Sequence, residues 1–352
     1  MKLVLIGDGE SPHLLKWARM LAPRVRLAAI SSRGFAPGWE LLLPDADRLA
    51  LNTSPDHGGG NIAIVKMLPR VGAWLAATDA DWIHAHYLTS HGMLAWAAKL
   101  GWRLRAQIAG SAWGSDILVT PNQGGAYRWM TKKVLRNCAV TTSDSHFMAD
   151  RMRELGAREV MVFPFGLEAM PRQNARKQPW LCFANRGLEP IYRPQRVIDA
   201  FARIVAAQPE ARLVVANDGS LRAALEADVA ARGLADKVTF VGRLDAAAQA
   251  GHYARATWFL SLPESDSVSV SVLEAMAHGG VPLLSELPAN REVIGDSARG
   301  LIVASLEDLP ARMAALDTTR LAAINRDWVA ANGLFEPHVQ RFLTRLRELS
   351  RP

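Results

Sequence analysis

The alternation of short apolar segments with amphipathic helical segments, which occurs twice along the chain, most constrains its fold. The first series begins with a strand at residues 3–6 and ends with one at residues 139–142. The second series begins at residues 181–184 and ends at residues 281–285. Strands that alternate with helices predict a parallel sheet covered on both faces. The sequence therefore predicts an α/β fold of two Rossmann-like, doubly wound domains.

The segment between the two series sets the predicted domain boundaries. Residues 169–179, AMPRQNARKQP, contain two prolines and no hydrophobic periodicity, so we interpret them as a linker. This predicts a first domain at residues 1–168, a second at residues 180–335, and a helix within residues 336–352 that packs back toward the first domain. Ligands of doubly wound sheets bind at the carboxyl ends of the strands, so we expect the two domains to face a ligand cleft.

Composition limits the class of protein and its compartment. The chain has 352 residues, of which 49% are hydrophobic and 21% charged, as in folded globular proteins. Its two cysteines, Cys138 and Cys182, cannot build a disulfide framework, and we expect both to be core thiols. The first ten residues lack the apolar region of a secretory signal, and no apolar run approaches the roughly 20 residues of a membrane span. We expect a cytoplasmic protein that meets a membrane only from the side.

Excess positive charge lies mainly in the first half of the chain. Up to Glu168 there are 19 Lys and Arg against 14 Asp and Glu, a net charge of +5 out of +7. In the segment 127–137, aromatic residues alternate with cations, and Arg128, Lys132 and Arg136 share one helix face. This face can bind anionic lipid headgroups or be an ordinary solvated surface. Because no nucleic-acid-binding motif is present, we expect no nucleic-acid partner.

The segment from Leu262 to Ile294 carries the strongest functional signal. A loop of small residues follows a predicted strand and leads into a helix that contains Glu274. Small residues let a backbone approach a ligand closely, and the N–H groups at a helix start favour phosphate. Asp266 and Glu274, with seven residues between them, are suited to accept hydrogen bonds from sugar hydroxyls. The structural alternative makes Asp266 a cap or turn residue and Glu274 an ordinary helix residue.

This segment resembles the donor-binding motif of the family-4 retaining glycosyltransferases, whose two Rossmann-like domains form the GT-B architecture. The family pattern is Glu, seven residues, then Glu-Ala-Met-Ala, and here Asp266 stands at the first position before Glu274-Ala275-Met276-Ala277. The resemblance implies that Asp266 contacts the donor sugar and Glu274 the nucleotide ribose. It also places four loop residues at the donor: Ser267, Val268, Ser269 and Val270.

Other segments of the second half extend the resemblance. ANRGLEPIYRPQRVIDAF resembles the segment that supplies an arginine and a lysine to the donor diphosphate. Arg186 matches the arginine, and the lysine position falls at Tyr192 or Arg193, of which we favour Arg193. ANDGS resembles the glycine turn of the family and places Gly219 there. VTFVGRL resembles the strand end that holds the base through its backbone, which implies roles for Val241 and Gly242.

Segments of the first half resemble the acceptor side of the family. They contribute five candidate residues: Gly9 and His13 from GDGESPHLLKWARML, His86 from DADWIHAHYLTSHG, and Trp113 and Asp116 from AGSAWGSDIL. Trp113 stands where many members have a histidine that touches the donor sugar, so that role does not carry over to it. His84 and His86 share a face of one strand, but no Cys or carboxylate in the same short stretch supports a zinc site. We predict no metal site and expect His84 to be a packed histidine.

The resemblance implies a retaining, metal-independent glycosyltransferase without a cofactor. It would move a sugar from a nucleotide-diphosphate sugar, with UDP favoured, to a sugar or lipid-linked hydroxyl acceptor in polysaccharide or glycolipid assembly. Two alternatives stay open: a sugar-nucleotide epimerase of the same architecture, and a sugar-nucleotide-binding protein without transferase activity. A nicotinamide-dependent enzyme is disfavoured, because the opening Gly-Asp-Gly is not followed by the rest of a dinucleotide fingerprint.

Overall fold

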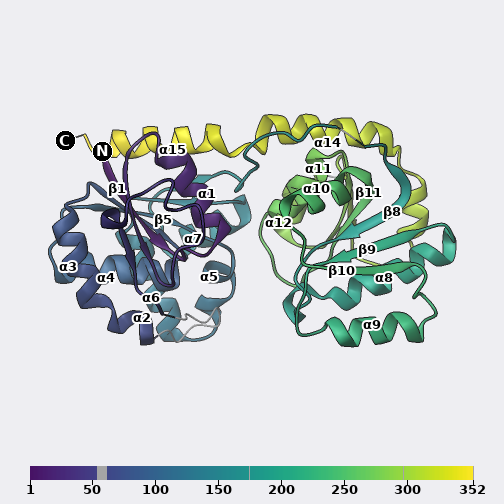
Figure 1. Ribbon diagram of the computed structural model, residues 1–352, viewed down its shortest axis with the longest axis horizontal. Helices are drawn as coiled ribbons and strands as arrows, with labels where there is room; N and C mark the ends of the chain where they lie inside the picture. The colour runs from purple at the N-terminus through teal and green to yellow at the C-terminus, as the bar shows by residue number, and fades with distance from the viewer. Residues whose placement is uncertain (54–61, 174, 296, 352) are drawn as a thin grey trace. The chain divides into compact units, whose positions relative to one another are not determined.

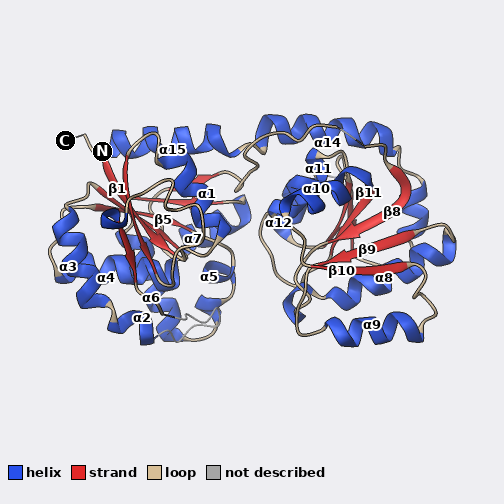
Figure 2. Cartoon of the chain, in the orientation of Figure 1, coloured by secondary structure: helices blue, strands red, loops and turns tan. Residues whose placement is uncertain are grey.

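The computed structural model describes residues 1–53, 62–173, 175–295 and 297–351, and the chain forms two compact units (Figure 1). The first unit contains Met1–Phe163 and Glu336–Pro352, and the second contains Pro164–Phe335. In each unit a parallel sheet carries helices on both faces, as Figure 2 shows. The predicted fold class of two Rossmann-like, doubly wound domains is therefore confirmed.

The sheet of the first unit has seven strands in the order β3-β2-β1-β4-β5-β6-β7, and every pair is parallel. The strands are β1 (Lys2–Gly7), β2 (Arg26–Ser31), β3 (Arg48–Ala50), β4 (Trp82–His86), β5 (Gln107–Ser111), β6 (Val140–Ser143) and β7 (Val160–Val162). The α-helices of this unit are α1 (Pro12–Leu21), α2 (Ile62–Lys66), α3 (Leu68–Thr78), α4 (Met93–Gly101), α5 (Ser115–Leu118), α6 (Gly125–Asn137), α7 (His146–Glu154) and α15 (Phe335–Leu349).

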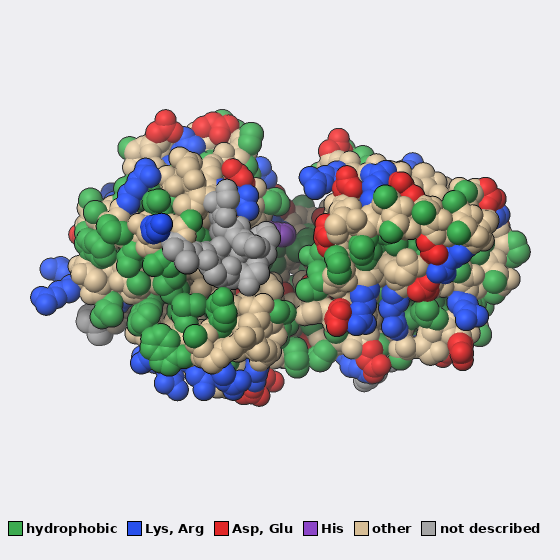
Figure 3. Space-filling model, turned by 90° about the horizontal axis from the view of Figure 1, so that it is seen from below, with side chains coloured by type: hydrophobic (Ala, Val, Ile, Leu, Met, Phe, Trp, Pro, Cys, Tyr) green, Lys and Arg blue, Asp and Glu red, His purple; other side chains and the backbone are tan. Residues whose placement is uncertain are grey.

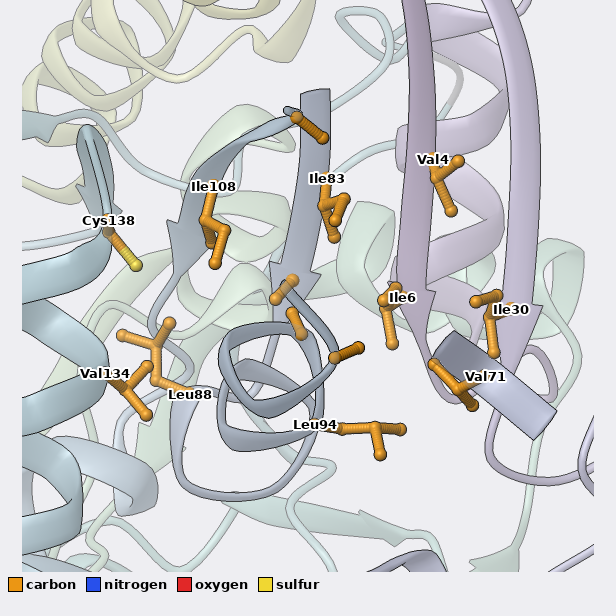
Figure 4. Packing of buried hydrophobic residues seen from close by; sticks show 14 of the residues in the cluster. Val4, Ile6, Ile30, Val71, Ile83, Leu88, Leu94, Ile108, Val134 and Cys138 are labelled. Atoms are coloured by element: carbon orange, nitrogen blue, oxygen red, sulfur yellow. The ribbon is translucent and has the colours of Figure 1, made fainter. Parts of the chain in front are cut away.

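Alternation along the strands divides the core of the first unit between two faces. On one face, strand side chains meet helices α3, α4 and α6 in the cluster labelled in Figure 4: Val4, Ile6, Ile30, Val71, Ile83, Leu88, Leu94, Ile108, Val134 and Cys138. Because successive strand residues point to opposite faces, His84 and His86 lie on the other face. There the Trp17 ring of α1 contacts both histidines, and the Phe342 ring of α15 contacts His84.

The sheet of the second unit has six parallel strands in the order β10-β9-β8-β11-β12-β13. They are β8 (Gln178–Ala184), β9 (Arg212–Ala216), β10 (Val238–Gly242), β11 (Ala256–Ser261), β12 (Val281–Ser285) and β13 (Leu301–Val303). Its α-helices are α8 (Pro194–Ala207), α9 (Arg222–Ala231), α10 (Ala246–Arg255), α11 (Val270–Ala277), α12 (Pro288–Ile294), α13 (Leu309–Ala314) and α14 (Thr318–Asn332). Helices α8, α9 and α13 pack on one face, and α10, α11, α12 and α14 on the other.

The boundary between the units lies earlier than the sequence predicts. The predicted linker, residues 169–179, belongs to the second unit, and its last two residues already begin β8. The reason is a backbone pairing of the preceding segment with the end of α14. Leu167 donates its N–H to the Gly333 carbonyl at 2.7 Å and accepts the N–H of Phe335 at 2.8 Å. These bonds tie residues 164–168 to the second unit.

The final helix, α15, belongs to the first unit, as the sequence predicts. Arg345 forms two hydrogen bonds with the Glu159 carboxylate, at 2.7 and 2.8 Å. Gln107 and Trp82 donate side-chain N–H groups to the end of the helix, at the Leu349 carbonyl and the Ser350 hydroxyl. The helix therefore completes one face of the first sheet.

Two further sequence expectations concern the cysteines and the membrane. Cys138 and Cys182 are buried free thiols, which confirms that they are core residues, and burial raises the pKa of Cys138 to about 12. None of the helices in the described part of the chain combines the length and apolar character needed to cross a bilayer.

Candidate functional site

Arg186 is the centre of a polar cluster in the second unit. It follows β8, and its Nη2 donates to Asp266 Oδ2 at 2.6 Å, while its Nη1 donates to Ser269 Oγ at 2.8 Å. Its guanidinium lies 4.6 Å from the centre of the Tyr192 ring, a cation–π geometry. The Nε atom is buried and has no hydrogen-bond partner among the described residues. The cluster thus holds an arginine in a fixed orientation and leaves its Nε–H donor unused.

Asp266 makes this cluster an ion pair of two partly buried groups. Both side chains are 21% exposed, and Asp266 Oδ1 also accepts the N–H of Ser267 at 3.0 Å. Burial raises the pKa of Asp266 above its ordinary value, while the positive charge of Arg186 and the Ser267 N–H act in the opposite direction. The two residues predicted to contact different parts of a donor therefore pair with each other in this structure.

The loop after Asp266 leads directly into helix α11. Ser267, Val268 and Ser269 are buried, and Val270 is the first helical residue. Ser269 is the N-cap residue; its side chain makes no hydrogen bond to the helix N–H groups, and its hydroxyl accepts from Arg186 instead. The amino end of a helix carries partial positive charge, so α11 and Arg186 both favour an anion beside this loop.

The second predicted cation, Arg193, is paired within the same loop region. Its backbone is left-handed, with φ of 45°, at the start of α8, and its Nη2 lies 3.1 Å from Glu264 Oε1. Glu264 in turn donates its N–H to the Ile191 carbonyl at 2.9 Å. Of the two possible lysine positions, Tyr192 supports the Arg186 guanidinium and Arg193 pairs with Glu264. Both contacts tie the segment 186–193 to the segment 264–269.

Glu274 lies on α11 and is held by side chains from α10. Its Oε2 accepts the Tyr253 hydroxyl at 2.9 Å and the Gln249 amide at 3.2 Å. Tyr253 Oη also accepts from Asn185 Nδ2 at 2.7 Å. Burial and the nearby Glu274 charge raise the pKa of Tyr253 well above 10, so the phenol stays protonated. Glu274 is therefore an oriented carboxylate and not a loosely held helix residue.

The predicted glycine turn and strand end lie at the carboxyl ends of neighbouring strands β9 and β10. A Cβ at Gly219 would lie 2.5 Å from the Leu188 carbonyl oxygen, so this position accepts only glycine without a shift. Val241 precedes Gly242, whose φ is 71° and whose carbonyl accepts the Asn217 N–H at 2.6 Å. The turn is thus joined to the end of β10.

Glu189 closes the other side of this turn. Its carboxylate accepts the N–H and the hydroxyl of Ser220, at 2.9 and 2.5 Å, and these bonds lower the pKa of Glu189. The N–H of Ser220 is therefore occupied by a carboxylate in this structure.

The candidates of the first unit gather around a layer of histidines at the end of β4. His84 is fully buried, and its Nε2 is 2.8 Å from Ser111 Oγ, so it is the packed histidine that the sequence predicts. The rings of His84 and His86 have centroids 4.2 Å apart, which confirms their common face. His86 is 3% exposed, and neither of its ring nitrogens has a hydrogen-bond partner within the described ranges. The pKa of His86 is lowered well below 6.5. Burial is the largest cause, and the nearby rings of His84, His91 and His13 add to it.

His13 and Trp113 form a stacked pair beside this layer. Their ring centroids are 5.1 Å apart with an angle of 28° between the planes, and the Trp113 ring is 5.8 Å from that of His86. His13 is the second residue of α1, whose N-cap Ser11 accepts the His13 N–H. Gly9 lies in the preceding loop, where a Cβ would be 2.6 Å from the Gly34 carbonyl oxygen. The indole of Trp113 thus lies where it can present an aromatic surface beside His86.

Asp116 differs from the sequence expectation of a residue that lines the site. Its side chain is fully buried, and its oxygens accept the N–H groups of Leu88 and Trp113 at 2.8 and 2.9 Å. Burial raises the pKa of Asp116 to about 6, and the backbone N–H bonds oppose this shift. Asp116 therefore fixes the loop that carries Trp113, and its side chain is closed off from solvent in this structure.

The structure also identifies residues that sequence reasoning missed. Gln249 and Tyr253 hold Glu274, Glu264 holds Arg193, and Asn185 holds Tyr253, and the sequence motifs gave none of these four residues a role. Two local signals point to them: Asn185 directly precedes Arg186, and Glu264 lies two residues before Asp266. Within the ranges that the structure covers, no group of three or more His, Cys, Asp and Glu side chains is arranged to hold a metal ion.

Comparison with protein families matches both units. Residues 8–166 match the family described as "Glycosyl transferase 4-like domain", and residues 168–316 match "Glycosyl transferases group 1". A phosphatidyl-myo-inositol mannosyltransferase of Mycobacterium tuberculosis is 25% identical over 341 residues, which cover 92% of this chain and 85% of that protein. The enzyme of the same name from Mycobacterium leprae is 23% identical, and the match covers 93% of this chain and 87% of that protein.

Solved structures resemble the fold over almost its full length. A sucrose-phosphate synthase from Thermosynechococcus elongatus has a TM-score of 0.81 with 18% identity, and the match covers 99% of each chain. HepE of Anabaena, solved in complex with UDP, has a TM-score of 0.75 with 14% identity and covers 98% of this chain and 100% of its own. At these identities the similarity establishes the fold.

Proposed function

This chain belongs to the family-4 glycosyltransferases, and we propose that it transfers a sugar from a nucleotide-diphosphate sugar to a hydroxyl acceptor. UDP is the favoured nucleotide, and the sugar is a hexosyl or N-acetylhexosaminyl group. In support, HepE of Anabaena was solved with UDP-glucose, and a pneumococcal O-GlcNAc transferase with UDP and GlcNAc. The similar proteins from Mycobacterium are phosphatidyl-myo-inositol mannosyltransferases. We place the acceptor of this chain in the same broad class, polysaccharide or glycolipid assembly.

The observation that carries this proposal is the arrangement around Arg186. A guanidinium fixed by Asp266, Ser269 and Tyr192 lies beside the amino end of α11 with Nε unpartnered. Guanidinium groups match phosphate oxygens in pairs, and a helix start adds N–H donors. This combination suits a diphosphate better than a neutral ligand. Arg193, once released from Glu264, supplies a second cation.

The proposed chemistry needs a stabilised leaving group more than a nucleophile. Fixed cations and N–H dipoles neutralise the charge that develops on the departing nucleotide diphosphate. The acceptor hydroxyl attacks from the leaving-group face, and a phosphate oxygen takes its proton, so the anomeric configuration is retained without a metal ion. In this scheme Arg186 and Arg193 act on the phosphates, and no side chain forms a bond to the sugar.

We propose the remaining contacts of the donor from the resemblance of the motifs to those of the family. We assign the ribose hydroxyls to Glu274 and the donor sugar to Asp266. The backbone at Val241 and Gly242 is assigned to the base, and Gly219 to the turn beside it. Ser267, Val268, Ser269 and Val270 give the donor a loop without bulky polar groups.

We assign the acceptor to the first unit. His86 is neutral at working pH because its pKa is lowered, and its buried, unbonded ring nitrogens would offer one donor and one acceptor to a hydroxyl once the ring is uncovered. The stacked rings of His13 and Trp113 give a surface on which a sugar ring can pack. Gly9 lies in the loop that precedes His13. These features support a sugar-bearing acceptor.

A basic surface of the first unit supports a membrane-associated acceptor. Residues 62–137 contain nine Lys and Arg against three Asp and Glu, and the fully buried Asp116 is one of the three acids. Trp129 of α6 is 57% exposed, with Lys133 over its ring. Figure 3 shows Lys and Arg side chains next to hydrophobic ones on the face of the first unit that it presents. We propose that this surface binds anionic headgroups at the cytoplasmic face of a membrane.

A panel of nucleotide sugars tests the proposed function. Purified protein is incubated with UDP-glucose, UDP-galactose, UDP-N-acetylglucosamine and GDP-mannose, and both thermal stability and release of free nucleotide are measured. A ligand at 100 times its dissociation constant stabilises the protein by about 2.7 kcal/mol. Stabilisation together with slow nucleotide release supports a transferase. Stabilisation by a nucleotide sugar without release of free nucleotide favours a binding protein. If none of the nucleotide sugars stabilises the protein or is turned over, the proposal is contradicted.

A further inference from the structure

A hydrogen-bonded chain behind Glu274 links residues from three separate elements. It begins at Asn185, which directly precedes Arg186, and runs through the Tyr253 hydroxyl to Glu274 Oε2, with distances of 2.7 and 2.9 Å. Gln249, one turn before Tyr253 on α10, donates to the same Glu274 oxygen at 3.2 Å. The chain therefore connects the segment of the proposed phosphate-binding arginine with the carboxylate assigned to ribose.

We propose that Tyr253, with help from Gln249, is a positioning residue that holds the Glu274 carboxylate in the orientation that accepts the ribose hydroxyls of the nucleotide. This inference rests on the proposed function, because it takes the assignment of Glu274 to ribose as given.

The direction of the bonds follows from the donor count. A phenol has one O–H to donate, and Asn185 already uses an acceptor position of the Tyr253 oxygen. A carboxylate oxygen can only accept, so the proton of Tyr253 points to Glu274 Oε2, and Ser271, which also bonds to the Tyr253 side chain, can act as a donor. The raised pKa of Tyr253 keeps this proton in place across the working pH range. The hydrogen bond is charge-assisted, because its acceptor is a carboxylate.

The ring of Tyr253 is itself fixed, so the hydroxyl it presents has little freedom. Tyr253 is 3% exposed; its ring meets that of Phe183 edge-on at 5.1 Å and stacks with His278 at 5.8 Å. A glutamate side chain has several rotatable bonds, and ordering them before the nucleotide arrives lowers the entropic cost of binding. A rigid phenol is therefore an effective support for the Glu274 carboxylate.

The test compares binding of two nucleotides by calorimetry. UDP carries both ribose hydroxyls, and 2′,3′-dideoxyuridine diphosphate carries neither. For Tyr253→Phe we expect UDP affinity to fall about tenfold, which corresponds to about 1.4 kcal/mol, while affinity for the dideoxy nucleotide stays that of the wild type. Gln249→Ala, at a less buried position, should show the same selectivity with a smaller loss. Tyr87→Phe, a tyrosine of the first unit whose hydroxyl bonds to Ser115, serves as the matched control and should leave both affinities unchanged.

Glu274→Gln separates failure of this inference from failure of the proposed function. If Tyr253 acts through Glu274, the double variant Tyr253→Phe/Glu274→Gln should bind UDP about as weakly as Glu274→Gln alone. Loss of affinity for both nucleotides to the same extent in Tyr253→Phe, or additive losses in the double variant, would overturn the positioning role. If Glu274→Gln itself leaves UDP affinity unchanged, the assignment of Glu274 to ribose is wrong, and the inference falls with it. Should Tyr253→Phe not fold, Gln249→Ala decides between the same outcomes.

Discussion

Asp266→Asn should strengthen binding of the free nucleotide while it weakens use of the nucleotide sugar. In the structure the Asp266 carboxylate is 2.6 Å from Arg186 Nη2, so it competes with a diphosphate for the same guanidinium. Both side chains are partly exposed, and pairs of that kind contribute about 0.5–1 kcal/mol after solvent screening. Removal of the negative charge should therefore lower the dissociation constant of UDP about two- to fivefold.

The pH dependence gives this prediction a sign that can be checked. Burial raises the pKa of Asp266 above its ordinary value, so lowering the pH through that pKa protonates the wild-type carboxylate and releases Arg186. The advantage of the Asn variant in UDP affinity should be full at neutral pH and should disappear as the pH falls through the pKa of Asp266. Titration of the nucleotide phosphates affects both proteins alike, so it cancels in the ratio of the two dissociation constants.

The assay is calorimetry with UDP from pH 4 to pH 8, together with turnover of the nucleotide sugar that performs best in the panel. We expect turnover to fall about ten- to a hundredfold, because a charged acceptor for a sugar hydroxyl is lost. Glu286→Gln removes one partner of the exposed Arg291–Glu286 pair elsewhere in the second unit and is the control. If Asp266→Asn binds UDP more weakly and retains turnover, the reasoning is refuted. Asp266 would then be assigned to the ribose and Glu274 to the donor sugar.

Three further predictions concern the phosphates, the membrane and the glycine turn. Arg186→Ala should lower turnover at least about tenfold with the fold intact by circular dichroism, since charge-assisted bonds to the diphosphate are lost; near wild-type activity would contradict its assignment. Combined charge reversal of Arg128, Lys132 and Arg136 to Glu should weaken sedimentation with anionic vesicles at 0.1 M salt, and equal binding to anionic and neutral vesicles would contradict the membrane surface. Gly219→Ala should lower the free energy of unfolding by about 1–3 kcal/mol in denaturant titration, because the added Cβ would lie 2.5 Å from the Leu188 carbonyl oxygen; unchanged stability would show that the turn adjusts.

The sequence by itself determined the class of fold, because hydrophobic periodicity is a local property. Strand β12 has the bounds predicted at residues 281–285, and β1 extends only one residue beyond each end of the strand predicted at residues 3–6. The short strands β3, β7 and β13 gave no comparable signal, since three residues are too few to establish a period. Each lies on or near an edge of its sheet, where pairing with a neighbour fixes it.

The sequence also located much of the candidate site, because its motifs are contiguous. The spacing of Asp266 and Glu274 and the small residues between them are readable without any structure. The common face of His84 and His86 follows from strand alternation alone. The full burial of Asp116 could not be predicted from the sequence. Its carboxylate accepts the N–H groups of Trp113, in a loop, and of Leu88, in a π-helical turn at Leu88–Gly92, and no sequence pattern predicts that turn.

Only the tertiary structure decided how the site residues are paired. Arg186 and Asp266 are 80 positions apart, and Asn185 and Tyr253 are 68 apart, so no local pattern relates them. Arg186 and Asp266 meet because β8 and β11 are neighbours in the parallel sheet, which brings the loops after their carboxyl ends together. The order of the strands is set by packing of the whole sheet against its two layers of helices. That order, and not the motifs, brings Arg186 to Asp266, whereas Tyr253 meets Glu274 because α10 and α11 pack on the same face of the sheet.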